Sequence, residues 1–212
     1  MLLSQNSKMK KSSDSKYLIY NFTLPAVKTC PSAKACKIGC YATQGTYNFS
    51  NVKAKHEQNY ELSKTDDFIS LLDAEVKALY AKADKKGKKL VIRIHDAGDF
   101  YNLNYINKWL KIIDLNPNVL FYAYTKQIKI MQTIDLPLNF TTIASFGGVF
   151  DHLISNYSRH ARVFETKAEL DASGYADASN DDTVAFLSLN PKIGLVYHGV
   201  KSYAKTEWKQ SA

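Results

Sequence analysis

The chain has 212 residues, of which 45% are hydrophobic and 23% charged, so it is long enough and apolar enough to fold around a core. These values exclude a disordered, collagen-like or coiled-coil chain, and no apolar run approaches the roughly 18 residues of a transmembrane helix. The net charge of +8 favours an anionic partner such as nucleic acid, a phosphorylated metabolite or the ribosome. The alternative is that the lysines of residues 8–16 and 82–89 only solvate a terminus and a helix end.

The predicted elements begin after a polar segment. Residues 1–16 are expected to form a mobile N-terminal tail, and residues 17–22 a short strand. A helix is allowed over residues 51–62. A stronger helix pattern starts at Thr65, a suitable N-cap, and stops at Gly87. Its apolar residues recur three and four positions apart, at Phe68, Leu71, Leu72, Val76, Leu79 and Tyr80.

Beyond Gly87, β-prone runs alternate with helical ones. Strands are expected at residues 90–94, 119–124, 140–144, 161–164, 184–189 and 193–197. Helices are expected at residues 103–113, 127–133 and 149–156, and a polar loop or excursion at residues 166–182. This alternation predicts an α/β fold with a parallel sheet, either open or forming a partial (β/α) barrel. Residues 17–212 are expected to form a single α/β domain.

Polar residues follow several of the expected strands. Because the carboxyl ends of parallel strands meet at one edge of a sheet, these residues are expected to share a rim where a site lies. The catalytic candidates are His95, Asp96, Asp99, Lys126 and His198. The candidates for binding a cofactor or ligand through the backbone or a hydroxyl are Gly98, Ser145, Gly147 and Gly148.

Each candidate also has a structural interpretation. His95 and Asp96 could cap the following helix and bind loop amides. Lys126 could extend along the start of a helix instead of binding an anion. The glycines of residues 145–148 could serve a turn that needs positive φ, and His198 could be a hydrogen-bonded core histidine.

Three cysteines lie within eleven residues, in the pattern Cys30-x5-Cys36-x3-Cys40. The start of the chain does not resemble a secretory signal, so we expect a cytoplasmic, reducing location and a metal rather than a disulfide. Zinc would need a fourth ligand, and residues 41–50 contain no histidine. A [4Fe–4S] cluster fits better, because three thiolates can hold it and leave one iron open as a Lewis acid.

The cysteine segment and the strand ends resemble a known family. The matching residues are Leu24-Pro25, Cys30-Pro31, Cys36, Cys40-Tyr41-Ala42, the run from Arg93 to Phe100 and the run from Tyr122 to Lys126. These residues resemble the phage "gene product 88" family, from about Leu24 to the His198-Gly199 end. The resemblance implies a viral or prophage origin, hence the cytoplasm of a host cell, and assigns little function.

A looser resemblance is to radical S-adenosylmethionine enzymes. These enzymes place a three-cysteine loop after the first strand of a partial barrel and a glycine and acidic motif after the second. Gly98-Asp99 occupies the comparable position here. The resemblance implies a radical-SAM-like partial barrel with an N-terminal cysteine loop. The cysteine spacing differs from the usual C-x3-C-x2-C, so binding of S-adenosylmethionine is left open.

Three functions compete. The first, and the one that we expect, is an iron–sulfur hydrolase of a small anionic ester or phosphoester, with Asp96, Asp99 or His95 as general base. In that hypothesis Lys126 or His198 stabilises the developing negative charge. The second is a radical S-adenosylmethionine enzyme. The third is a module that binds nucleic acid and uses its metal only for structure. No membrane partner is expected.

Overall fold

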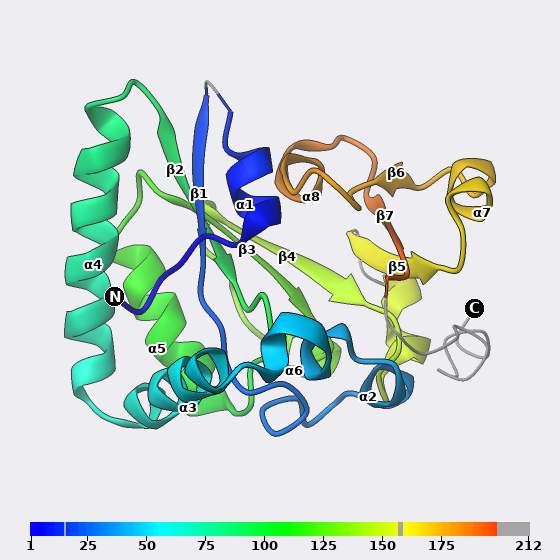
Figure 1. The fold of residues 1–212 in the computed structure, drawn as a ribbon, viewed down its shortest axis with the longest axis horizontal. Coiled ribbons are helices and arrows are strands. Elements are labelled where there is room, and N and C mark those ends of the chain that lie inside the picture. The colour runs from blue at the N-terminus through cyan, green and yellow to red at the C-terminus, as the bar shows by residue number, and fades with distance from the viewer. Residues whose placement is uncertain (15, 157–158, 199–212) are drawn as a thin grey trace.

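The computed structural model describes residues 1–14, 16–156 and 159–198, and its core is one parallel β-sheet (Figure 1). In this part of the chain the sheet has seven strands in the order β1-β2-β3-β4-β5-β7-β6 and forms a half-barrel. All neighbouring strands run parallel. The strands are β1 (Tyr17–Asn21), β2 (Lys89–Ile94), β3 (Leu120–Thr125), β4 (Phe140–Ser145), β5 (His160–Phe164), β6 (Ala176–Asp177) and β7 (Lys192–Val196).

Helices fill the crossovers between the strands, so the predicted α/β class and parallel sheet are confirmed. The α-helices are α1 (Ser7–Ser12), α2 (Ala35–Ile38), α3 (Ser50–Lys64), α4 (Asp67–Asp84), α5 (Leu103–Asp114), α6 (Ile128–Met131), α7 (Lys167–Ala172) and α8 (Thr183–Leu187). The 3-10 helices are η1 (Tyr41–Thr43), η2 (Gly45–Asn48) and η3 (Asp151–Asn156). In the described residues, every helix is too short or too polar to cross a bilayer.

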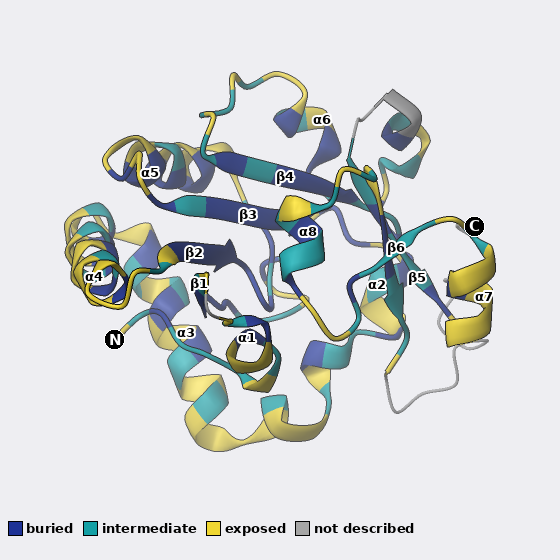
Figure 2. Cartoon of the chain, turned by 90° about the horizontal axis from the view of Figure 1, so that it is seen from above, coloured by how far each residue is buried: buried dark blue, intermediate teal, exposed yellow. Residues whose placement is uncertain are grey.

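The helices α4 and α5 cover the outer face of the half-barrel (Figure 2). Even-numbered residues of β1 and β2 point to this face, since side chains alternate along a strand. They pack against the apolar side of α4, whose spacing the sequence predicts, and against Trp109 of α5. The fully buried side chains here include Phe22, Phe68, Leu72, Ile92, Phe100, Trp109 and Phe121. Of the three apolar clusters in the described residues, the one on this face contains the most side chains.

The inner face of the half-barrel is covered by α1 and α8. Ile19, Val91 and Tyr122 come from the strands, and Met9 of α1 is fully buried among them. The structure differs here from the mobile tail expected for residues 1–16. This polar segment contains two buried apolar residues, Leu3 in the outer cluster and Met9 in the inner one, together with several hydrogen-bonding groups. In addition, Ser4 pairs with Asn21 of β1 through two backbone hydrogen bonds of 2.9 and 2.8 Å.

The later elements also differ from expectation. Residues 184–189 were expected to be a strand but lie mostly in α8, because a short apolar run does not distinguish a strand from a buried helix. The expected loop 166–182 contains α7 and β6. Thr65 caps the end of α3, so it does not start α4. The helix expected over residues 149–156 is the 3-10 helix η3.

Candidate functional site

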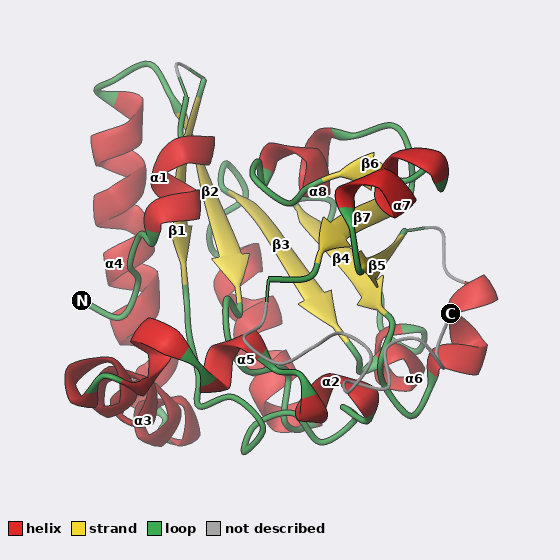
Figure 3. Cartoon of the chain, turned by 45° about the vertical axis from the view of Figure 1, so that its right-hand side comes forward, coloured by secondary structure: helices red, strands yellow, loops and turns green. Residues whose placement is uncertain are grey.

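A cavity of about 300 Å³ opens where the strands of the half-barrel end. The strands point toward the side of the molecule on which α2 and α6 lie (Figure 3). Side chains from the cysteine loop, the segment after β2, and the ends of β3, β4 and β7 line the cavity. The structure therefore brings most of the predicted site residues together, at Cys30, Cys36, Cys40, His95, Asp96, Gly98, Asp99, Lys126, Ser145 and His198.

The cysteine loop is attached to the end of β4 by backbone contacts. The amides of Lys34 and Cys36 both donate to the carbonyl of Gly147, at 2.9 and 3.2 Å. Ala33 forms a bridge with Gly148, where a Cβ atom would lie 2.8 Å from the carbonyl oxygen of Ser32. A side chain at position 148 would therefore push the cysteine loop away from the sheet.

Gly147 and Gly148 act through this loop and do not line the cavity. Their amides donate to the two carboxylate oxygens of Asp151, at 2.8 and 2.9 Å. Gly147 also has a φ of 96°, which favours glycine. The sequence indicated either close approach of a ligand or a turn with positive φ; in this structure Gly147 has the positive φ, the approaching group is the cysteine loop, and both amides are occupied by Asp151.

The three thiols line the same cavity and influence one another. Burial raises the pKa of Cys30 to about 12, and the nearby charges of Asp99 and Cys36 add to that effect. Burial also raises the pKa of Cys40, again with a contribution from Cys36. The backbone amides of Ala42 and Thr43 act in the opposite direction by hydrogen bonding to the Cys40 sulfur. Cys36 therefore lies near both of the other cysteines.

The three thiols of the cavity are not placed to hold a single metal ion. The described residues contain no group of three or more His, Cys, Asp or Glu side chains placed to hold one ion. A structural zinc site needs four such ligands around one centre. A cluster spreads its thiolate ligands over several iron atoms, so the sulfurs need not converge on one point. Cys30, Cys36 and Cys40 are the residues of this cavity that could hold a cluster.

Lys126 brings a positive charge to the thiols. Its Nζ atom donates to the Oγ atom of Ser145 at 2.8 Å, which fixes the side chain across the end of β4. Burial lowers the pKa of Lys126, but attraction to the charges that Cys36, Asp99 and Cys30 carry when deprotonated outweighs burial and raises it. The ammonium group is therefore held charged in the cavity, beside two of the three cysteines.

His95 has the surroundings of a structural residue. Its ring packs against Phe100 and Tyr105, with centroid distances of 4.6 and 5.6 Å, and its Nε2 atom is 2.9 Å from the Tyr105 hydroxyl. Burial and, to a smaller degree, the charge of Arg93 lower the pKa of His95 to about 3. The backbone φ of 66° turns this residue away from the direction of β2. At neutral pH the imidazole is uncharged, and one ring nitrogen is engaged.

Asp99 joins the ends of β2 and β3. Its Oδ1 atom accepts from the Phe100 amide and the Thr125 hydroxyl, both at 2.7 Å, and its Oδ2 atom accepts from the Lys126 amide at 2.8 Å. Burial raises the pKa of Asp99, although these hydrogen bonds oppose the change. Its neighbour Gly98 has a φ of 88°, and a Cβ atom there would lie 2.6 Å from the Leu24 Cβ. Both residues shape the cavity wall.

The Asp96 carboxylate accepts hydrogen bonds from both the N-terminal segment and the segment that follows the cysteines. Its Oδ2 atom accepts from the Asn6 amide at 2.9 Å and from the Tyr47 hydroxyl at 2.7 Å. Its Oδ1 atom is 3.4 Å from Nη1 of Arg93, and the Tyr41 hydroxyl donates to its backbone carbonyl. These contacts hold a charged acceptor at the cavity wall.

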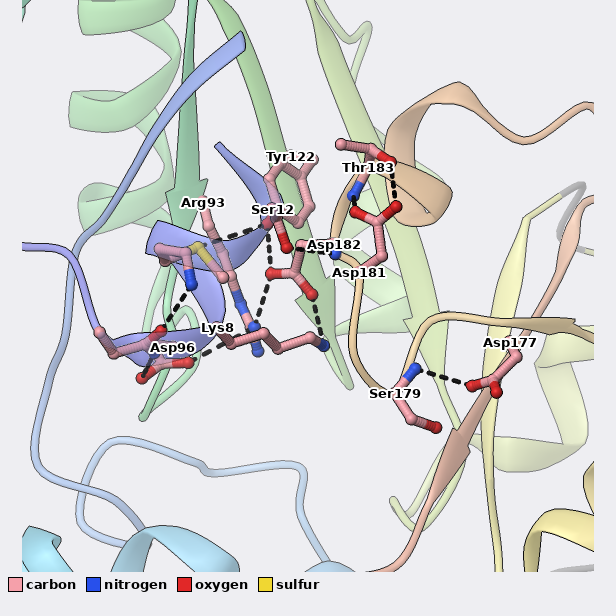
Figure 4. Close-up of polar contacts among 12 residues, drawn as sticks. Lys8, Ser12, Arg93, Asp96, Tyr122, Asp177, Ser179, Asp181, Asp182 and Thr183 are labelled. Carbon is pink, nitrogen blue, oxygen red and sulfur yellow. Dashed lines mark hydrogen bonds and ion pairs between the residues drawn. The ribbon is translucent and has the colours of Figure 1, made fainter. Parts of the chain in front are cut away.

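A buried polar network lies beneath the cavity, and the sequence did not predict it (Figure 4). Asp182 is completely buried and lies 2.9 Å from Arg93 and 2.5 Å from Lys8. The Tyr122 hydroxyl donates to the same carboxylate at 2.5 Å, and the Asp182 amide donates to Ser12 at 2.8 Å. Burial raises the pKa of Asp182, but the two cations outweigh it and lower the pKa. One signal was available: Arg93 interrupts an otherwise apolar strand.

His198 lies at the rim of the cavity on the carboxyl-terminal side of β7. It is exposed, so it is not the core histidine that one interpretation of the sequence expected. Its ring centroid is 5.3 Å from that of Tyr41, beside the cysteine segment. The cavity also contains tyrosines that the sequence pattern did not single out, namely Tyr41, Tyr47, Tyr124 and Tyr197.

The fold and the site define a parallel α/β half-barrel protein with a polar, cysteine-lined cavity at the carboxyl edge of its sheet. A sequence profile of the family described as "Gene product 88" matches residues 1–207. The chain therefore belongs to the gene product 88 family, which confirms the first resemblance. These comparisons give no support to the second resemblance, to radical S-adenosylmethionine enzymes.

Two similar proteins come from mycobacteriophages. The chain is 32% identical over 102 residues to the "Gene 88 protein" of Mycobacterium phage L5, which covers 46% of this chain and 43% of that protein. It is 31% identical over 102 residues to the "Gene 88 protein" of Mycobacterium phage D29, covering 46% and 42%. The match thus spans less than half the length of either relative. No solved structure matches the chain.

Proposed function

We propose that this protein is an iron–sulfur enzyme whose [4Fe–4S] cluster is held by Cys30, Cys36 and Cys40. The observation that carries the proposal is that three thiols of one loop line a single cavity at the carboxyl edge of a parallel sheet. Active sites of parallel α/β proteins lie at this edge, and thiolates are the ligands that iron–sulfur clusters take. When bound, such a cluster supplies an iron without a protein ligand, which can act as a Lewis acid or an electron donor.

The other cavity residues bind and orient a small polar molecule beside the cysteines. Lys126 presents a fixed ammonium group, because its Nζ atom donates a hydrogen bond to the Ser145 hydroxyl. Asp96 presents a carboxylate of opposite sign, oriented by Asn6 and Tyr47. A cavity that offers both charges complements a molecule that carries both, such as the amino-acid end of S-adenosylmethionine.

The contacts favour an S-adenosylmethionine reaction over hydrolysis. Hydrolysis needs a general base with a free lone pair near the substrate. The low pKa of His95 and its contact with Tyr105 argue against this residue as the base, and Asp99 already accepts three hydrogen bonds. A cysteine loop after β1 and Gly98-Asp99 after β2 of a parallel half-barrel further support the cofactor proposal. Ester or phosphoester hydrolysis is the second candidate, with Asp96 as its base.

Anaerobic reconstitution with iron and sulfide tests the cluster. We expect a brown protein with about four iron and four sulfide ions per chain, measured by chemical analysis and visible absorption. Replacing any one of Cys30, Cys36 and Cys40 by Ser should abolish most of this incorporation, while Lys37→Ala on the same loop should not. A colourless protein that binds one equivalent of zinc through the same cysteines would overturn the proposal.

Adding S-adenosylmethionine to the reduced, reconstituted protein tests the reaction class. We expect a changed electron paramagnetic resonance signal, because a ligand at the open iron alters its surroundings. Lys126→Ala and Asp96→Asn should weaken this response while the iron content is unchanged. An intact cluster whose signal does not change at millimolar cofactor would reject this class and leave hydrolysis, which can be assayed with ester and phosphoester substrates.

A further inference from the structure

Two lysine-rich segments, far apart in the sequence, meet at the amino ends of β1 and β2. The amide of Lys89 donates to the carbonyl of Lys16 at 2.8 Å, and Nζ of Lys88 donates to the carbonyl of Asp14 at 2.5 Å. The turn between α4 and β2 and the start of β1 lie at the same end of the sheet, opposite the end to which the strands point (Figures 1 and 3). Gly87, with a φ of 63°, makes this turn tight enough to bring the lysines together.

We call this region the basic surface and define it by eight lysines. They are Lys10, Lys11, Lys16, Lys82, Lys85, Lys86, Lys88 and Lys89. Residues 10–16 and 82–89 contain two acidic residues, Asp14 and Asp84, so most of the protein's net positive charge is concentrated here.

The lysines of the basic surface are only partly neutralised within the protein, where the charge of Asp14 interacts with Lys16 and Lys88. In the described part of the chain, none of the eight forms a salt bridge, although lysines elsewhere do, as Lys28 does with Glu57 and Lys77 with Asp73. Lys82 instead donates to the hydroxyl of Tyr20. Like charges at this density repel one another, and a bound polyanion would relieve that repulsion.

The composition of the basic surface indicates phosphate groups as its target. Seven of its lysines are exposed, and none of the exposed large hydrophobic residues belongs to either segment. A membrane-binding surface of this kind would add apolar side chains that enter the lipid. A surface for single strands would present aromatic rings on which bases stack. Lysines alone suit the regular phosphates of a duplex.

We propose that the basic surface binds the phosphate backbone of duplex nucleic acid without reading its sequence. The surface and the cavity lie at opposite edges of the same sheet, so neither needs the other to bind its ligand. The protein would therefore hold a duplex at one end and carry out its chemistry at the other.

Fluorescence anisotropy with a labelled random-sequence DNA duplex tests the proposal. We compare two triple variants that change the net charge equally and whose folding is verified by circular dichroism. The test variant changes three lysines of the basic surface to Glu, at Lys85, Lys86 and Lys89. The control variant changes three exposed lysines elsewhere to Glu, at Lys53, Lys111 and Lys129.

We expect micromolar binding by the original protein that weakens steeply with salt. The test variant should lose about tenfold or more in affinity, and its slope of log affinity against log salt should fall by about 2 to 3. The control should bind within about twofold of the original protein, because its lysines contact no phosphate. Equal losses in the two variants would show only a net-charge effect and would overturn the proposal.

Two further measurements separate this proposal from its competitors. Cys36→Ser should leave duplex binding unchanged, so failure of the iron–sulfur proposal and failure of this one are distinguishable. Tighter binding to single strands than to duplex, or binding to anionic vesicles without binding to DNA, would assign the basic surface to a different partner and reject the proposal.

Discussion

The two faces of the half-barrel are stabilised in different ways. The outer face, under α4 and α5, is an apolar layer in which Phe68, Leu72 and Trp109 are fully buried. The inner face, under α1 and α8, contains the charges of Arg93 and Asp182 among a smaller set of apolar side chains.

The difference follows from how each face is assembled. Long helices cover the outer face. Burial of their apolar sides is non-directional, so it does not depend on exact contact geometry. Two short helices from segments about 170 residues apart supply the inner face, as the contact of Ser12 with Asp182 shows. Short elements offer little apolar area, so directional contacts fix their position. The directional contacts therefore define how α1 and α8 sit on the inner face. If one partner is lost, however, a buried charge is left unpaired.

The largest expected effect comes from removing the central charge of the inner face. Asp182→Ala leaves Arg93 and Lys8 without their shared carboxylate, and breaking a buried pair in this way costs about 4 kcal/mol of unfolding free energy. The neighbouring Asp181→Ala, at an exposed position, should cost about 1 kcal/mol or less. Urea unfolding of both variants measures the difference, and equal costs would contradict the assigned role of Asp182.

A truncation on the outer face should have a somewhat smaller effect. Leu72→Ala removes a fully buried side chain from α4 and should cost about 3 kcal/mol through lost burial and a cavity. Leu71, the adjacent residue of the same helix, is 50% exposed, so Leu71→Ala should cost about 0.5 kcal/mol or less. The same unfolding assay applies. A loss of stability at position 71 that matches the loss at position 72 would mean that α4 packs through another side.

The smallest of these effects is a change with pH. The folded state lowers the pKa of His95 from the ordinary 6.5 to about 3, so folding favours the neutral ring. The stability that the neutral His95 ring contributes to the folded state is complete above pH 6.5. It is lost as the pH falls toward 3, and at pH 5 the free energy of unfolding is lower by about 2 kcal/mol. His95→Phe should reduce this pH dependence, and His152→Gln, at an exposed position, should not. Protonation of Asp182 would lower stability in a separate pH range, below about pH 4.

The sequence predicted the outer half of the fold well. Strands β1 to β5 and the helices α4 and α5 lie within a few residues of their expected positions, because apolar periodicity reports burial against a large neighbour. The sequence did not predict α1 and α8, the helices that cover the inner face. A single buried Met9 and a five-residue apolar helix carry no periodic signal, since contacts distant in the sequence decide their structure.

The sequence predicted where the candidate site lies better than it predicted the role of each residue in it. Counting residues that follow parallel strands correctly placed Asp96, Lys126 and the cysteines around one cavity. The same reasoning could not show that His95 packs among aromatic rings, because a left-handed backbone conformation redirects its side chain. Nor could it find Asp182, whose partners come from three other elements.

The contact between Ser12 and the Asp182 amide has a consequence for biosynthesis. Helix α1 leaves the ribosome before the strands of the half-barrel, yet its anchor is made 170 residues later, about 10–35 s at ordinary elongation rates. During that interval the outer layer can assemble while the interior of the half-barrel is still open to water. Closing that interior is therefore a late event, and α1 must wait for it.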